Sequence, residues 1–158
     1  MSWKISKKGF GLAAILAGFL AATLPTLGSA SIWFDEAFSR HIIRFDFGRI
    51  WHFTSLDVHP PFYYFCLKVW SMIFGASDFS IRALSVAFGL ATLIALYFLI
   101  KRLYNSKAAL LSVFFVAFSP VCIKYSQEAR MYTLVALLAI GSIRAYYEAF
   151  VAANSQKK

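Results

Sequence analysis

Acidic residues and cysteines are both scarce in this sequence, and each scarcity excludes a class of protein. The 158 residues include seven Asp and Glu against sixteen Lys and Arg, and two cysteines. Cys66 and Cys122 form no zinc-type cluster and their spacing requires no disulfide, so two buried thiols are the simpler interpretation. Phosphate-binding glycine loops, dinucleotide fingerprints and Ser-His-Asp arrangements are also missing. The net charge of +9 comes without a basic stripe or a nucleic-acid motif, so we expect no nucleic-acid partner.

Apolar residues dominate what is present. The chain is 60% hydrophobic and 18% aromatic, with a mean hydropathy of +0.66, which exceeds the values of soluble domains. A helix needs about 20 apolar residues to cross a bilayer, and no alternating strand pattern offers a barrel instead. The sequence therefore predicts an all-α, polytopic integral membrane protein with one membrane domain over residues 1–158. The four expected spans are residues 10–31, 83–100, 108–123 and 130–148.

Basic residues next to these spans predict their orientation. Segments rich in Lys and Arg stay in the cytoplasm, and membrane lipids with anionic headgroups attract them. We therefore expect a cytoplasmic N-terminus in a plasma or inner membrane, with the loop over residues 32–82 and the start of the fourth span outside. The basic residues are Lys4, Lys7, Lys8, Lys101, Arg102, Lys107, Arg144, Lys157 and Lys158.

The N-terminus also permits a rival interpretation. Its lysines, apolar run and small residues Gly28-Ser29-Ala30 resemble a cleavable signal peptide. The charge-free run continues to Phe34, which is longer than a usual signal core. An uncleaved first helix is therefore the favoured interpretation.

The expected outer loop has too regular a pattern for a plain connector. Between residues 32 and 53, large apolar side chains recur every three or four positions among arginines, which is typical of helices lying in the membrane interface. Pro60-Pro61 breaks the chain and can start another amphipathic helix that runs through Phe74 and ends at Gly75. A purely structural belt along the membrane is the alternative interpretation of these aromatic residues.

Two neighbouring acids, Asp35 and Glu36, open this loop. A carboxylate next to lipid costs free energy unless it has a partner or a task. The two side chains would lie about 100° apart on a helix, so they cannot point equally into one site. We expect one to act as a base and the other to anchor the loop by pairing with Arg40 or Arg44.

A further acid, Glu128, lies at the expected start of the fourth span. With Arg130 it would open that helix behind Ser126 as the N-cap, which is also a sufficient structural reason for an acid there. Asp57 and His59 offer two metal ligands, but a third and a fourth are not evident. Each acid alone is more simply structural, whereas three acidic clusters on one face of the membrane favour a site.

The ordered motifs of the chain resemble a known family. From about Gly9 to Phe150 they are similar to the N-terminal part of GT-C glycosyltransferases, most closely the dolichyl-phosphate-mannose-protein mannosyltransferase and aminoarabinose-transferase-like group. The motifs are Trp33-Phe34-Asp35-Glu36-Ala37, Asp57-Val58-His59-Pro60-Pro61-Phe62-Tyr63-Tyr64, Phe74-Gly75-Ala76-Ser77-Asp78-Phe79-Ser80-Ile81-Arg82, Ser119-Pro120 and Tyr125-Ser126-Gln127-Glu128-Ala129-Arg130-Met131-Tyr132.

The resemblance implies transfer of a sugar outside the cytoplasm, from a polyprenyl-phosphate carrier to a lipid, glycan or protein acceptor, with inversion. It implies Asp35 as the catalytic carboxylate, acting as the general base, and Glu128 as a second acidic residue of the site, with Glu36 in support. A carboxylate can take the proton of the attacking hydroxyl, and cations can stabilise the departing phosphate. The proposed phosphate-binding residues are Arg82, Arg130 and Lys124. The proposed substrate-lining residues are His59, Tyr63, Tyr64, Tyr125 and Tyr132.

Other interpretations remain open. Members of this group have many more spans, so the chain resembles only their N-terminal portion, and activity of this chain alone is an open question. A small membrane protein that binds or flips a polyprenyl-phosphate sugar, or a structural subunit, would also fit the composition. No cofactor is required by the sequence, and a divalent metal stays an alternative because members of the group differ in this respect.

Overall fold

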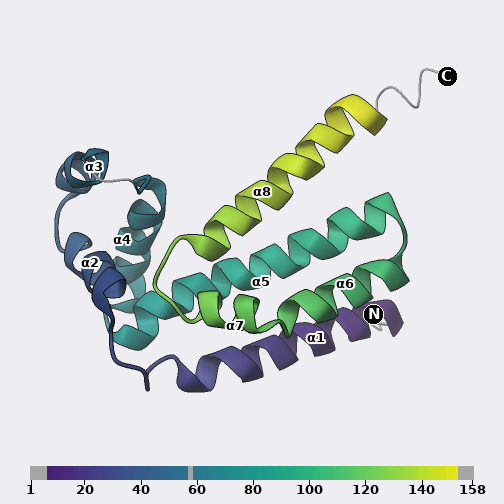
Figure 1. Cartoon of the computed structure of the whole chain (residues 1–158), viewed down its shortest axis with the longest axis horizontal. Coiled ribbons are helices and arrows are strands. Elements are labelled where there is room, and N and C mark those ends of the chain that lie inside the picture. Colours follow the sequence, from purple (N-terminus) through teal and green to yellow (C-terminus); the bar gives the residue numbers. More distant parts are fainter. Residues whose placement is uncertain (1–6, 57–58, 153–158) are drawn as a thin grey trace, which may run out of the picture.

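The computed structural model describes residues 7–56 and 59–152, and within this part of the chain every regular element is a helix (Figure 1). The prediction of an all-α protein is therefore confirmed. Asp57, Lys4, Lys157 and Lys158 lie outside the described residues. The elements are α1 (Lys7–Thr23), the 3-10 turn η1 (Leu24–Thr26), α2 (Phe34–Ile42), α3 (Phe47–Ser55), α4 (Phe62–Phe74), α5 (Asp78–Leu103), α6 (Ser106–Ala117), α7 (Pro120–Ser126), α8 (Tyr132–Tyr146) and its π-helical extension η2 (Tyr147–Ala152).

Three stretches of helix are long and apolar enough to cross a membrane: Gly9–Thr26, Asp78–Leu103 and Tyr132–Val151. The pair α6 and α7 passes the same test jointly, but it bends by 63° between Ala117 and Pro120. Ser119 caps α7 by accepting a hydrogen bond from the Cys122 N–H, and Pro120 has no N–H to continue α6. Residues 7–56 and 59–152 therefore contain three or four candidate spans, as expected of a polytopic membrane protein.

Helix α5 is the central element of the long helices. It packs against α1, α4, α6, α7 and α8, and its buried residues run along most of its length. One apolar cluster joins α1, α5 and α6 around Phe19, Leu93 and Val113. A second cluster, around Ile50, Tyr64 and other buried residues, joins α2, α3 and α4 to the start of α5.

The short helices α2, α3 and α4 gather at one end of the long helices, where they form what we call the outer segment, residues 31–77 (Figure 1). Helix α4 ends at Gly75, whose φ of +80° lies in the region that favours glycine, and this agrees with the end predicted from the sequence. Ser77 then caps α5 by accepting a hydrogen bond from the Ser80 N–H. Helix α5 consequently starts at Asp78, before Arg82.

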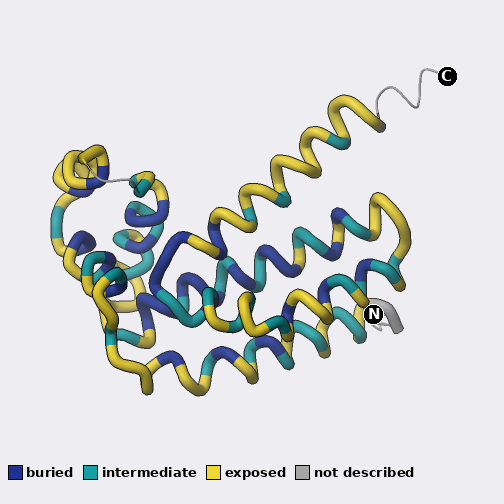
Figure 2. Tube along the Cα trace, in the orientation of Figure 1, coloured by how far each residue is buried: buried dark blue, intermediate teal, exposed yellow. Residues whose placement is uncertain are grey.

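The last helix diverges from the others (Figure 1). The buried residues of α8 are Thr133 and Leu134 in its first turn, and most of the rest of the helix is exposed (Figure 2). The expected start of this helix was wrong: Ser126 lies in the last turn of α7 and does not cap α8. Residues 127–131 form a separate turn between α7 and α8, and Glu128 and Arg130 belong to that turn.

Candidate functional site

A buried ion pair joins α2 to α5 at the base of the outer segment. Arg82 Nε lies 2.8 Å from Glu36 Oε1, and Arg82 Nη2 lies 2.6 Å from Glu36 Oε2. The two side chains are 3% and 1% exposed. Such a two-pronged contact between guanidinium and carboxylate is the strongest geometry available to this pair. The pair fixes the start of α2 against α5 across 46 positions of sequence.

Both members of this pair are fully engaged by further hydrogen bonds. Arg82 also donates to the backbone carbonyl oxygens of Leu27, Ala30 and Ser31, so its five N–H groups all have acceptors. Glu36 Oε1 accepts a hydrogen bond from the Ala129 N–H at 2.9 Å. Burial opposes ionisation of Glu36, but the hydrogen bonds from Arg82 and Ala129 outweigh it and hold the pKa of this carboxyl below its usual value.

These contacts correct one detail of the sequence interpretation. Glu36 does anchor the loop, but its partner is Arg82 and not Arg40 or Arg44. Arg40 pairs instead with Asp78 at the start of α5, with Nη1 and Oδ1 2.7 Å apart. The reason is orientation: Glu36 is one of the buried residues of α2, whereas Arg40 is half-exposed at its edge.

The second acid of the pair, Asp35, has different surroundings. Its side chain is 35% exposed, and its Oδ2 lies 3.5 Å from Nη2 of Arg130, which is 4% exposed. The same Nη2 lies 2.9 Å from His59 Nε2, and Arg130 Nη1 donates to the Asp35 backbone oxygen at 3.4 Å. Because Arg only donates hydrogen bonds, His59 Nε2 accepts here, which assigns the proton of the neutral ring to Nδ1. A buried cation therefore holds an accessible carboxylate.

A polar hollow of about 250 Å³ lies next to the ion pair, and Glu36 and Arg82 form part of its wall. Trp33, Lys124 and Glu128 also line it. Burial raises the pKa of the Glu128 carboxyl, and the nearby charge of Lys124 only partly offsets this. Asp35 and Arg130 do not line this hollow. Glu36 is thus a member of the ion pair, Glu128 lines the polar hollow beside it and Asp35 lies beside Arg130, so the three predicted acids do not share a single cavity.

The predicted substrate-lining tyrosines fall into two groups. Tyr63 and Tyr64 are 1% and 0% exposed and pack in the core under α2, where the Tyr63 hydroxyl lies 3.2 Å from Ser85 Oγ. Burial raises the pKa of Tyr63. The rings of Tyr125 and Tyr132 are in tilted contact with their centres 4.5 Å apart, and both line a separate, mostly apolar hollow of about 230 Å³ beside α5.

One residue that lines the polar hollow, Gln127, was not identified as a site residue from the sequence. Gln127 donates to the Thr23 backbone oxygen at 3.1 Å and to Thr26 Oγ1 at 2.5 Å, and so joins the turn before α8 to the end of α1. Its position directly before Glu128 in the quoted motif was the available signal. Among residues 7–56 and 59–152, no three His, Cys, Asp or Glu side chains are grouped so that they could hold a metal ion.

Comparison with models of known protein families identifies a family. The family model described as dolichyl-phosphate-mannose-protein mannosyltransferase matches residues 58–157. This range contains His59, Arg82, Lys124, Glu128 and Arg130, whereas Asp35 and Glu36 precede it. No curated protein and no solved structure matches the chain.

Proposed function

The chain belongs to the dolichyl-phosphate-mannose-protein mannosyltransferase family, and on that premise we propose that it transfers a sugar from a polyprenyl-phosphate carrier. Its family makes it GT-C glycosyltransferase-like, and its long apolar helices make it an integral membrane protein. The proposed acceptor is a hydroxyl group of a lipid, glycan or protein on the non-cytoplasmic side. The proposed stereochemical outcome is inversion at the anomeric carbon.

The observation that carries this proposal is the environment of Asp35. A general base must be ionised, oriented and reachable by the acceptor. Asp35 is one-third exposed, and the buried guanidinium of Arg130 lies beside it. In the proposed step, the acceptor oxygen attacks the anomeric carbon, its proton passes to Asp35, and the bond from that carbon to the phosphate oxygen breaks. The phosphate departs with the bonding electrons, so one displacement inverts the centre.

The cations near the site can stabilise this departing phosphate to different degrees. Arg130 and Lys124 are proposed to contact it, since Lys124 is exposed beside the polar hollow and Arg130 already lies next to Asp35. Arg82 has every N–H group engaged, so we assign it the task of positioning Glu36. Glu128 and Trp33 line the polar hollow and are proposed to contact the sugar.

The test is transfer of labelled sugar from polyprenyl-phosphate donors in membranes that contain this chain. We expect Asp35→Asn to lower the rate about a hundredfold or more, the range for loss of a general base. The matched control is Asp46→Asn, because Asp46 is an exposed acid of the same outer segment and Asn can still cap α3. This control should transfer sugar at the rate of the unaltered chain.

Two results would overturn the proposal. Equal transfer by Asp35→Asn and the unaltered chain would remove the base from the mechanism. No transfer by any inserted form, with donor binding retained, would favour a protein that binds or flips the carrier without chemistry.

A further inference from the structure

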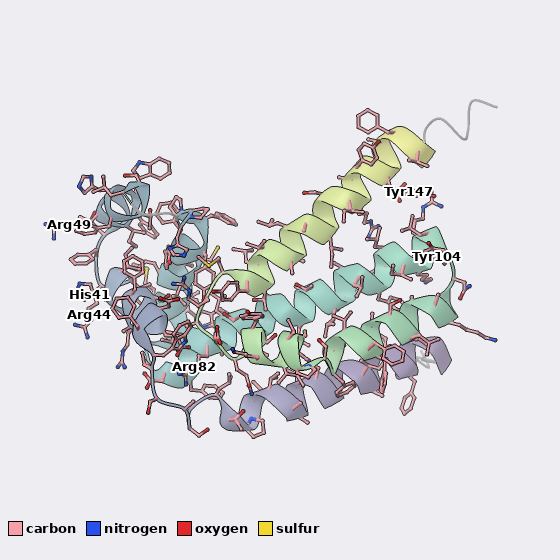
Figure 3. All side chains as sticks on the ribbon, viewed as in Figure 1. His41, Arg44, Arg49, Arg82, Tyr104 and Tyr147 are labelled. Carbon is pink, nitrogen blue, oxygen red and sulfur yellow. The ribbon has the colours of Figure 1, made fainter. Side chains whose placement is uncertain are left out.

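The outward face of α2 carries a basic hollow that is separate from the site described above. This hollow of about 250 Å³ is lined by Arg40, His41 and Arg44, with Ile32 and Ala37 completing it. Ala37, Arg40 and His41 of α2 are three and four positions apart, which is the spacing of one helix face. His41 and Arg44 project to the same side of the outer segment, away from the long helices (Figure 3).

Helix geometry separates the basic hollow from Asp35. Asp35 and Ala37 are two positions apart, which places them on nearly opposite sides of α2. The buried side chains of α2 are Glu36, Ser39 and Ile42, and none of them lines the basic hollow. A change in this hollow therefore leaves the contacts of Asp35 with Arg130 in place.

The basic hollow has an excess of positive charge. Arg40 shares its charge with Asp78 at 2.7 Å, whereas Arg44 has no acidic partner in the part of the chain that the structure describes. The other carboxylates among the described residues of the outer segment are engaged elsewhere: Asp35 with Arg130, Glu36 with Arg82 and Asp46 with Arg49. An anion entering the hollow would thus meet one free and one shared guanidinium, and guanidinium groups match the geometry of phosphate.

An apolar hollow adjoins the basic one, and His41 lines both. This second hollow of about 200 Å³ is lined by Phe38, Ile42, Phe45 and Phe53 besides His41. The rings of His41 and Phe45 meet edge to face at 5.2 Å, and those of Phe45 and Phe53 lie at the same separation. The basic hollow and the aromatic, apolar hollow therefore lie side by side on the outward face of α2.

We propose that the two hollows together bind one acidic phospholipid. Its phosphate would lie between Arg40 and Arg44, and the first carbons of an acyl chain would lie against Phe45 and Phe53. The outer segment itself indicates a lipid as the source of the phosphate, because Trp51 is 59% exposed, as expected of an element at the level of the headgroups. An inorganic anion has no apolar part that could fill the apolar hollow, whereas a phospholipid has acyl chains.

The experiment measures lipids retained by the full chain purified in detergent, after exchange with equimolar phosphatidylglycerol and phosphatidylcholine. We expect phosphatidylglycerol to be retained preferentially and Arg44→Gln to lower this preference about tenfold, as for loss of one charge-assisted hydrogen bond. Arg44→Lys should keep part of the preference. Arg49→Gln is the matched control, because Arg49 is an exposed arginine of the same segment that lines neither hollow and should leave retention unchanged.

Each other outcome would overturn the proposal. Equal losses from Arg44→Gln and Arg49→Gln would indicate general surface charge without a site. Competition by inorganic phosphate at millimolar concentration would indicate a simple anion site. Displacement by a polyprenyl phosphate but not by phosphatidylglycerol would assign the hollows to the sugar carrier, and equal retention of both phospholipids would remove the anion requirement.

Discussion

Two adjacent carboxylates at the start of α2 have different tasks because a helix turns neighbouring side chains about 100° apart. Glu36 faces the core, where Arg82 and the Ala129 N–H occupy its oxygens. Asp35 faces partly outward beside Arg130. A carboxylate whose ionised form is held by three hydrogen bonds is a weak base, so the proton acceptor of the proposed reaction is the more exposed neighbour.

At the same scale, the ion pair of Glu36 and Arg82 predicts a pH dependence of stability. The pKa of Glu36 in the folded protein is lower than its ordinary value of 4.5, so the unfolded chain binds the proton more readily. The pair therefore contributes fully above that ordinary value, and its contribution is lost as the pH falls through the lower, folded pKa. We expect the unfolding temperature of the chain in detergent to fall in this acidic range.

The variant Glu36→Gln tests the same pair near neutral pH. Loss of the charge leaves Arg82 buried without a counter-ion, which should cost about 3–5 kcal/mol of folding free energy. Asp46→Asn is again the control, since Asp46 pairs with Arg49 on the surface and its loss should alter the unfolding temperature little. An acid-dependence that survives unchanged in Glu36→Gln would show that other carboxylates cause it.

Among the elements, the crossing of α1, α5 and α7 depends on a glycine. A Cβ atom at Gly89 would lie 2.8 Å from Ser126 Oγ and 3.1 Å from Phe19 Cζ, both of which are buried side chains. The smallest residue lets three helices approach at this point, as is common in membrane bundles. The turn that carries Glu128 and Arg130 follows Ser126 directly, so this crossing also positions the candidate site.

We accordingly expect Gly89→Ala to destabilise the protein by about 1–3 kcal/mol, the range for overpacking a core. The measurement is the thermal unfolding midpoint in detergent. Gly141→Ala is the matched control, because Gly141 lies in α8 and a methyl group added there would meet no neighbouring side chain within 4 Å. This control should leave stability unchanged or raise it slightly through helix propensity. Equal effects of the two changes would mean that the crossing tolerates a methyl group.

Two helix boundaries follow from local chemistry that can be read in the sequence. Gly75 ends α4 and Pro120 starts a new helix, in each case through a property of that residue alone. The start of α5 is harder to predict, because the charge of Arg82 suggests the end of the outer loop, whereas the structure buries this residue inside the helix against Glu36. A charge inside a span becomes predictable only when its partner is known.

For the whole molecule, the sequence predicts a set of site residues but not their arrangement. The sequence predicts that Asp35, Glu36 and Glu128 belong to one end of the molecule. The structure places Glu36 and Glu128 beside Arg82, and Asp35 beside Arg130. The sequence could not predict that Glu36 would take the buried position, because that position depends on the Ala129 N–H, 93 residues away. Hydrophobic periodicity gives the face of a helix but not the distant group that this face meets.

Tyr104 and Arg49 lie at opposite ends of the molecule (Figure 3), so the two ends can be used to test the orientation of the chain in the membrane. Lys101 and Arg102 close α5 at the end near Tyr104, and the positive-inside rule places that end in the cytoplasm. With Cys66 and Cys122 changed to Ser, a Ser55→Cys variant in α3 should react in intact cells with a membrane-impermeant maleimide. Tyr104→Cys should react only after the membrane is opened. The reverse pattern would place Asp35 in the cytoplasm and remove the proposed transfer from the outer side.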